Sequence, residues 1–289
     1  MSHLFCFGLG YSAEHLAGLV AARGWRIGGT GTTPEAVERM RRLGYEGHIF
    51  DGEAPTAGLA SLLDSVTHVL ISVPPDATGD PVLRWHAVHL ATAERLEWIG
   101  YLSTVGVYGD HQGRWVDETT PAAPISDRSR YRLAAENAWL SFGKAHAKRV
   151  EIFRLAGIYG PGRSVVDDLR QGVARRIVKP GQVFNRIHVA DIAVTLLAAI
   201  EAPAKHSIYN VADDEPTDSE TVILYAADLI GVSPPPPITL ADAKLSPMAR
   251  SFYAECKRVS NRRIKSDLGV KLGYPSYREG LRAIVAARA

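Results

Sequence analysis

Cysteine is scarce in this chain of 289 residues, which contains only Cys6 and Cys256, far apart in the sequence. Two such cysteines cannot form a disulfide framework or a metal cage of the usual spacing. His86 and His89 fall on one predicted helix face without a third ligand, so we expect no metal site. A chain without disulfides is typical of a reducing compartment, and we therefore expect a cytoplasmic location.

A large excess of charge and a long apolar run are also lacking. Lys and Arg number 33 against 31 Asp and Glu, and a net charge of +2 is too small to indicate a nucleic-acid partner. No apolar stretch reaches the roughly 18 residues of a membrane span, and the first residues lack the basic segment of a secretory signal peptide. We therefore expect a soluble protein that acts on a small molecule, with neither nucleic acid nor a membrane as partner.

The first half of the chain does contain a regular alternation of short apolar runs and amphipathic stretches. The apolar runs, which we predict to be strands, are HLFCFGLG, WRIGGTGTT, YEGHIFDGE, THVLISVPP and WIGYLSTVGVYG. Strands that alternate with helices predict an α/β fold with a doubly wound parallel sheet. In the less regular second half, Thr217 is the expected N-cap of one helix and Asp191 the cap of another.

A glycine-rich turn joins the first predicted strand to the first helix. Gly8, Gly10 and Ala13 form the pattern G-x-G-x-x-A. The first glycine permits the tight turn, the second lets a diphosphate approach the backbone, and the small third residue lets the helix pack on the strand. We predict that the turn, with Tyr11 and Ser12 at the helix start, binds the diphosphate of a dinucleotide.

The end of the second strand lacks the carboxylate that usually binds the ribose of NAD. Thr30 and Thr32 stand there instead, and their hydroxyls could donate to a 2′-phosphate. The following helix carries three arginines, Arg39, Arg41 and Arg42, which either lie close to that phosphate or face water. This pattern favours NADP over NAD.

Further cofactor contacts are expected where the third and fourth strands end. Asp51 closes the third strand and either accepts a hydrogen bond from the adenine amino group or serves as a turn residue. Ser72 and Val73 end the fourth strand beside the predicted turn. We assign residues 1–157 to a Rossmann-type dinucleotide-binding domain and residues 158–289 mainly to a smaller substrate-binding region, with residues 185–212 returning to the sheet.

Five segments resemble one family in the order in which they occur: LSTVGVYGD, FRLAGIYGPGRS, RIHVADIA, IYNVADDEPT and LGYPSYREGL. The chain is similar to the extended short-chain dehydrogenases/reductases, the NAD-dependent epimerase/dehydratase family, along essentially its whole length. The resemblance implies a Rossmann-type fold, an NAD(P) cofactor, and an oxidoreductase or epimerase/dehydratase-like reaction. A homodimer through two long helices is usual in that family.

The catalytic pattern of the family is only partly present. The resemblance implies that Thr104 corresponds to the Ser/Thr that binds the substrate oxygen, but the Tyr-x-x-x-Lys positions hold Arg128 and Arg132 in the stretch SDRSRYRLAAENAW. Arg128 cannot trade a proton near neutral pH, whereas Arg132 could hold the cofactor as a fixed cation. Tyr131, a turn further along the helix, is the candidate acid/base. The chain thus resembles the atypical branch of the family.

Three residues near the ends of other predicted strands are candidates for substrate contact. Tyr108 and Tyr159 belong to the segments VYG and IYGPG, and Arg163 follows the latter and could bind an anionic group. We expect an NAD(P)-dependent enzyme that acts on a small hydroxyl or carbonyl compound or on a nucleotide sugar. The alternative is a non-catalytic NADP-binding sensor or regulatory protein.

Overall fold

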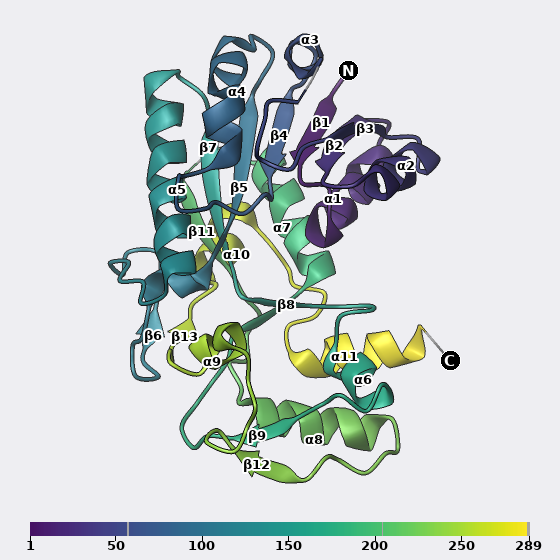
Figure 1. Ribbon diagram of the computed structural model, residues 1–289, viewed down its shortest axis with the longest axis vertical. Helices are drawn as coiled ribbons and strands as arrows, with labels where there is room; N and C mark the ends of the chain where they lie inside the picture. Colours follow the sequence, from purple (N-terminus) through teal and green to yellow (C-terminus); the bar gives the residue numbers. More distant parts are fainter. Residues whose placement is uncertain (57, 204, 288–289) are drawn as a thin grey trace. The chain divides into compact units, whose positions relative to one another are not determined.

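Seven parallel strands form the central sheet in the computed structural model, which describes residues 1–56, 58–203 and 205–287 (Figure 1). These strands are β1 (His3–Phe7), β2 (Arg26–Gly31), β3 (Glu46–Ile49), β4 (His68–Ile71), β5 (Trp98–Thr104), β7 (Val150–Leu155) and β11 (Ile208–Val211). Their order across the sheet is β11-β7-β5-β4-β1-β2-β3. The order reverses between β1 and β4, as in a doubly wound Rossmann-type sheet. The α/β fold predicted from the alternating pattern is confirmed.

Six helices connect these strands: α1 (Tyr11–Ala21), α2 (Pro34–Arg42), α3 (Leu59–Leu63), α4 (Pro81–Thr92), α5 (Asp127–Ala145) and α7 (Val189–Glu201). Local sequence explains where several of them begin and end. Thr33 and Asp80 cap α2 and α4 by accepting hydrogen bonds from first-turn amides, and a proline follows each cap. Helix α5 ends where Ala147 adopts a left-handed conformation with φ of 52° and the Lys148 amide donates to the Gly143 carbonyl.

The chain divides into two compact units. The first consists of Met1–Thr104, Asp127–Arg154 and Ile192–Tyr209, and the second of Val105–Ser126, Leu155–Asp191 and Asn210–Ala289. All five residues of β1 are buried, as expected for a parallel strand covered on both faces. The core of the first unit contains the aromatic side chains Phe5, Phe7, Phe50, Tyr101, Trp139 and Phe142.

The second unit has short elements: η1 (Val105–Tyr108), β6 (Trp115–Val116), β8 (Gly157–Tyr159), α6 (Val165–Arg170), β9 (Arg176–Val178), β10 (Arg186–His188), α8 (Ser219–Leu229), β12 (Pro237–Thr239), α9 (Pro247–Phe252), β13 (Arg258–Val259), α10 (Arg262–Leu268) and α11 (Tyr277–Ala286). Strand pairs β10–β8, β12–β9 and β13–β6 are parallel. Its core is formed by α6, α8 and α11 around Tyr159 and Tyr277. The N-cap of α8 is Asp218, which accepts from the Thr221 amide, so the prediction of Thr217 was wrong by one residue.

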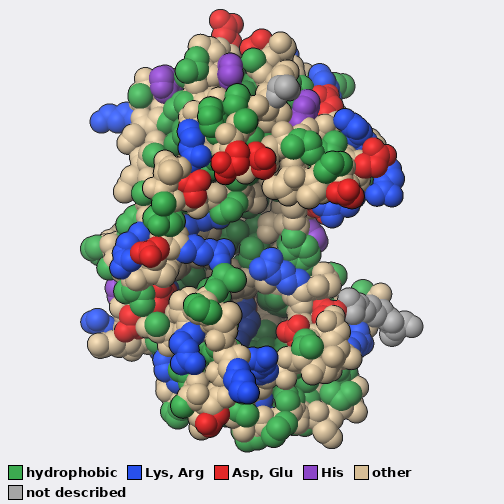
Figure 2. Space-filling view, in the orientation of Figure 1, with side chains coloured by type: hydrophobic (Ala, Val, Ile, Leu, Met, Phe, Trp, Pro, Cys, Tyr) green, Lys and Arg blue, Asp and Glu red, His purple; other side chains and the backbone are tan. Residues whose placement is uncertain are grey.

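No helix among the described residues is both long and apolar enough to cross a membrane. Basic and acidic side chains are interspersed on the face of the molecule that Figure 2 shows. The division of labour between cofactor and substrate regions, and the cytoplasmic location, stay predictions.

Candidate functional site

The glycine turn lies between β1 and α1, where the strand order reverses. Gly8 has φ of +81°, a backbone conformation that residues other than glycine rarely adopt. A β-carbon on Gly8 would also lie 3.2 Å from Val73 Cγ2 and 3.3 Å from the Val73 amide nitrogen, at the end of β4. The turn therefore requires glycine both for its backbone conformation and for its close approach to β4.

Thr30 on β2 supports this turn through two hydrogen bonds. Its hydroxyl accepts a hydrogen bond of 2.8 Å from the Gly8 amide, and its carbonyl accepts one of 2.8 Å from the Leu9 amide. The Thr30 side chain is only 1% exposed. The sequence suggests that this hydroxyl could donate to a 2′-phosphate; in the structure it accepts from the backbone of the turn, and its contact with a cofactor stays a prediction.

The end of β2 is otherwise open. Thr32 is exposed, and residues 30–33 include no carboxylate. Of the arginines on α2, Arg39 forms an ion pair with Glu14 and Arg41 lies 4.0 Å from Glu38. For Arg42, no ion pair is found within the described part of the chain. At the end of β3, exposed Asp51 accepts a hydrogen bond of 3.0 Å from the Glu53 amide, which makes it a turn residue as well.

All residues predicted to bind the cofactor or to catalyse belong to the first unit. They lie at or just after the ends of β1 to β5, at the start of α1, or on α5: Gly8, Gly10, Tyr11, Ser12, Ala13, Thr30, Thr32, Asp51, Ser72, Val73, Thr104, Tyr131 and Arg132. The carboxyl ends of parallel strands meet at one edge of a sheet, which is where open α/β folds bind ligands. The Ser72 amide donates to the Phe7 carbonyl at 2.8 Å, which keeps the end of β4 beside the glycine turn.

Thr104 is the last residue of β5 and is partly buried. On α5, Arg128 is exposed and Tyr131 partly buried. Arg132 donates a hydrogen bond of 2.8 Å to the Leu102 carbonyl and one of 3.2 Å to the Tyr101 hydroxyl. The guanidinium predicted to hold the cofactor is therefore already bonded to β5, and its role as a cofactor ligand stays a prediction.

The three predicted substrate residues lie in the second unit. Tyr108 is fully buried, and its hydroxyl donates to Asn210 Oδ1 at 2.8 Å. Tyr159 donates to the Ser276 carbonyl at 3.2 Å, and burial, followed by the charge of Asp213, raises its pKa. Arg163 is exposed on the loop after β8. The structure thus gives both tyrosines structural partners.

Several buried carboxylates have contacts that were not predicted from the sequence. Glu136 on α5 forms an ion pair with Arg154 on β7, and both side chains are at most 5% exposed. Asp213 is buried, and burial raises its pKa to about 8. The carboxylate of Asp191 accepts hydrogen bonds from the Gly273 and Tyr274 amides, a tertiary contact rather than the helix cap we expected. The sequence offers one signal of such buried charges: charged residues within an otherwise apolar stretch, as in Val150–Leu155, VEIFRL.

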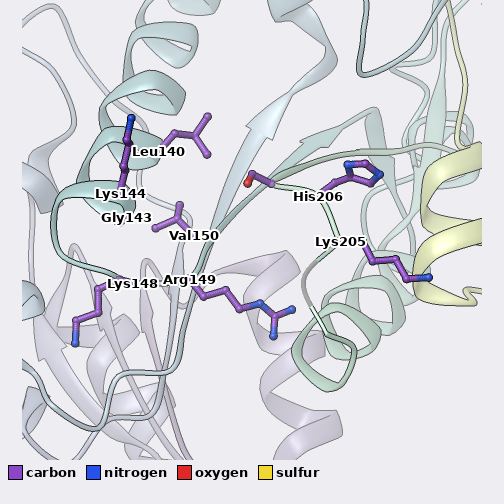
Figure 3. A pocket seen from close by; sticks show the side chains of 9 residues that line it. Leu140, Gly143, Lys144, Lys148, Arg149, Val150, Lys205 and His206 are labelled. Carbon is purple, nitrogen blue, oxygen red and sulfur yellow. The ribbon is translucent and has the colours of Figure 1, made fainter.

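A pocket of about 480 Å³ lies at the amino ends of β7 and β11, at the edge of the sheet opposite to the glycine turn (Figure 3). Lys144, Lys148, Arg149 and Lys205 line it, and Figure 3 shows their side chains pointing in different directions. Lys148 donates to the Ala93 carbonyl at 2.6 Å and Arg149 to the Ala199 carbonyl at 2.5 Å. These cations therefore do not converge on a common ligand position.

A second pocket, of about 450 Å³, lies within the second unit. It is lined by residues 177–184 of β9 and the following loop, residues 218–221 at the start of α8, and Tyr253. Among the described residues, no three His, Cys, Asp or Glu side chains are grouped as for a metal ion.

Comparison with known proteins agrees with this architecture. Over 286 residues, covering 95% of this chain and 97% of the relative, the chain is 28% identical to protein YeeZ of Escherichia coli K12. A functionally unknown conserved protein from Silicibacter pomeroyi has a solved structure with a TM-score of 0.90, 49% identity and 99% of both chains covered. UDP-glucuronic acid 4-epimerase from Bacillus cereus, solved in complex with NAD, shares the fold at 17% identity, with a TM-score of 0.76 over 98% of this chain and 97% of that one.

Residues 78–212 match the NAD dependent epimerase/dehydratase family. The match extends from just before α4 to the end of β11, so it includes β5, the helix α5 that follows it, and the segment that returns to the sheet. The glycine turn precedes the matched residues. The chain thus resembles the NAD-dependent epimerase/dehydratase family in the matched residues and in its fold.

Proposed function

We propose that the protein binds a nicotinamide dinucleotide with its diphosphate on the turn from Gly8 to Ala13. One observation carries this proposal: a β-carbon on Gly10 would have no atom within 4 Å, so the space above the turn is open. No side chain caps α1 at Gly10, which leaves the positive end of the helix dipole to a ligand. The Bacillus cereus epimerase has NAD on the same fold.

We further propose that NADP is preferred over NAD. Residues 30–33 at the end of β2 include no carboxylate that would repel a 2′-phosphate, and Thr32 is exposed there. Arg42 has no ion-pair partner among the described residues and supplies a cation on the helix that follows β2. Binding constants for both cofactors, measured by calorimetry, test this preference, and equal constants would exclude it.

The reaction that fits these residues is an oxidation-reduction or an epimerase/dehydratase-like conversion of a small hydroxyl or carbonyl compound or a nucleotide sugar. The bound cofactor would supply hydride transfer. Thr104 would donate a hydrogen bond to the substrate oxygen, and Tyr131 would give or take the proton. Tyr108, Tyr159 and Arg163, the predicted substrate residues, do not line the pocket between β9 and α8.

A second function has a specific observation in its favour. Arg128 and Arg132 occupy the family's Tyr and Lys positions, and Arg132 is already bonded to β5. A protein that binds NADP without turnover, as a sensor or regulator, would need neither catalytic side chain. A homodimer and a cytoplasmic location remain part of both proposals, and light scattering on the purified protein tests the former.

The decisive experiment compares wild-type protein with Gly10→Ala. Alanine fits the fold at this position because its β-carbon meets no atom, but it occupies the space where a diphosphate would lie. We expect dinucleotide affinity to fall by at least about tenfold, with thermal stability changed by no more than about 0.5 kcal/mol. Unchanged affinity would contradict binding at this turn.

Turnover then separates the two functions. The protein is incubated with NADPH or NADP and a panel of carbonyl compounds, alcohols and nucleotide sugars, and absorbance is followed near 340 nm, where the reduced cofactor absorbs. An enzyme should lose activity as Thr104→Val and Tyr131→Phe, each of which removes one hydroxyl. Tight cofactor binding without any turnover would favour the sensor.

A further inference from the structure

Two neighbouring contacts fasten α5 to the last residues of β5. The first comes from Arg132, whose Nη1 donates to the Leu102 carbonyl at 2.8 Å and to the Tyr101 hydroxyl at 3.2 Å. The guanidinium carbon also lies 5.6 Å from the centre of the Tyr101 ring, within the range of a cation–π contact. The planar, five-donor head of arginine suits this double contact better than a lysine ammonium would.

The second contact comes from Glu136, which lies four residues after Arg132 and therefore on the same face of the helix. Its Oε1 accepts a hydrogen bond of 2.5 Å from the Ser103 hydroxyl. Arg154 on β7 holds the same carboxylate from the other side, with Nη2 2.7 Å from Oε2 and Nε 3.1 Å from Oε1. Ser103, Glu136 and Arg154 are 6%, 1% and 4% exposed, so this network is shielded from water.

These contacts bind the residues that immediately precede Thr104. We propose that Arg132 and Glu136 form a two-point clamp that fixes the end of β5 and thereby orients Thr104, so that both are positioning residues. In this reading Arg132 is not the cation that holds the cofactor ribose. The role of Thr104 rests on the proposed function, whereas the clamp itself does not.

The two contacts have different chemistry, which allows them to be broken separately. Ser103→Ala removes the hydroxyl that reaches Glu136 but leaves the Glu136–Arg154 ion pair intact. Arg132→Met removes the guanidinium while keeping an apolar side chain beside Tyr101, and Arg132→Lys keeps the charge with a single ammonium. Asn137→Ala changes an exposed residue of the same helix and serves as the control.

Hydrogen exchange of the backbone amides of residues 101–104 reports on the clamp directly. We expect exchange to become about tenfold faster in Ser103→Ala and in Arg132→Met, as for the loss of one hydrogen bond, and to stay unchanged in Asn137→Ala. Arg132→Lys should fall between the wild type and Arg132→Met. Exchange rates in Ser103→Ala and Arg132→Met that equal those of the wild type would overturn the clamp.

Calorimetry with NADP and NAD tests the positioning role. A clamp predicts that Arg132→Met and Ser103→Ala change the dissociation constants by less than about threefold, whereas both alter the emission of bound NADPH, because the nicotinamide environment near Thr104 changes. A tenfold loss of affinity in Arg132→Met that Ser103→Ala does not share would make Arg132 a cofactor ligand and overturn the proposal. If no dinucleotide binds to the wild type, the proposed function fails, while the exchange experiment still decides on the clamp.

Discussion

The Thr30 hydroxyl could support the glycine turn or bind the 2′-phosphate of NADP, and replacing Thr30 distinguishes these two roles. Its buried hydroxyl accepts a hydrogen bond from the Gly8 amide, so Thr30→Val leaves that amide without its partner while keeping the volume of the side chain. Thr30→Ser retains the hydroxyl and serves as the matched control. The prediction is that Thr30→Val weakens the whole turn, whichever dinucleotide is added.

The magnitude follows from the cost of an unpaired amide. Leaving a buried donor without an acceptor costs about 1–3 kcal/mol. Because Gly8 is only partly buried, we expect the lower part of this range, about 1–2 kcal/mol. For a chain of this size the melting temperature should fall by roughly 2–4 °C per kcal/mol. If cofactor binding must restore the turn, affinity falls by about 5- to 30-fold.

The assay is calorimetry with NAD and NADP on wild type, Thr30→Val and Thr30→Ser, together with thermal melts. If Thr30 supports the glycine turn, Thr30→Val should lose affinity for both cofactors equally, and Thr30→Ser should lose little. A loss confined to NADP would refute this reasoning, because it would mean that the hydroxyl donates to the 2′-phosphate.

Three further predictions concern stability and are measured by thermal or urea unfolding. Ala147→Gly should stabilise the protein by about 1 kcal/mol, because alanine has φ of 52° there and glycine adopts this conformation without strain; an unchanged melting temperature would contradict it. Arg154→Met should cost about 3–5 kcal/mol, because it leaves the Glu136 carboxylate buried and unpaired, and Arg154→Met with Glu136→Leu should recover much of this loss. Burial raises the pKa of Asp213 from 3.8 to about 8. The contribution of its neutral form to folding stability is therefore complete below pH 3.8 and is lost as the pH rises to about 8. Melting temperatures should therefore fall less between about pH 5 and pH 8 in Asp213→Asn than in the wild type, and parallel curves would refute the assignment.

The sheet could be predicted from sequence because its signals are local. Buried parallel strands such as β1 are short continuous apolar runs, and helices such as α2 and α4 start with a capping residue followed by proline. The cap of α8 was wrong by one residue because Thr217 and Asp218 are adjacent and both residue types cap helices. The sequence placed the glycine turn correctly between strand and helix because only glycine tolerates its conformation.

The side-chain partners within the candidate site could not be predicted, because they depend on tertiary contacts. Nothing local distinguishes the buried Thr30, bonded to Gly8, from the exposed Thr32 two residues later. The contact of Glu136 with Arg154 likewise joins α5 to β7, and no spacing rule within one element reveals it. The arginines of α5 distinguish this helix in the sequence, but only the fold shows which residues its charged side chains contact.

The substitution of two arginines on α5 restricts the chemistry of the site. A guanidinium stays protonated at any pH that the protein experiences, so neither Arg128 nor Arg132 can give or take a proton. Arg132 donates to the Leu102 carbonyl on β5, and Arg128 is exposed at the position that we predict to correspond to the family's tyrosine. We therefore expect any acid/base step to use another group, Tyr131 first among them, and a turnover that persists in Tyr131→Phe would show that the proton is carried by a group other than Tyr131.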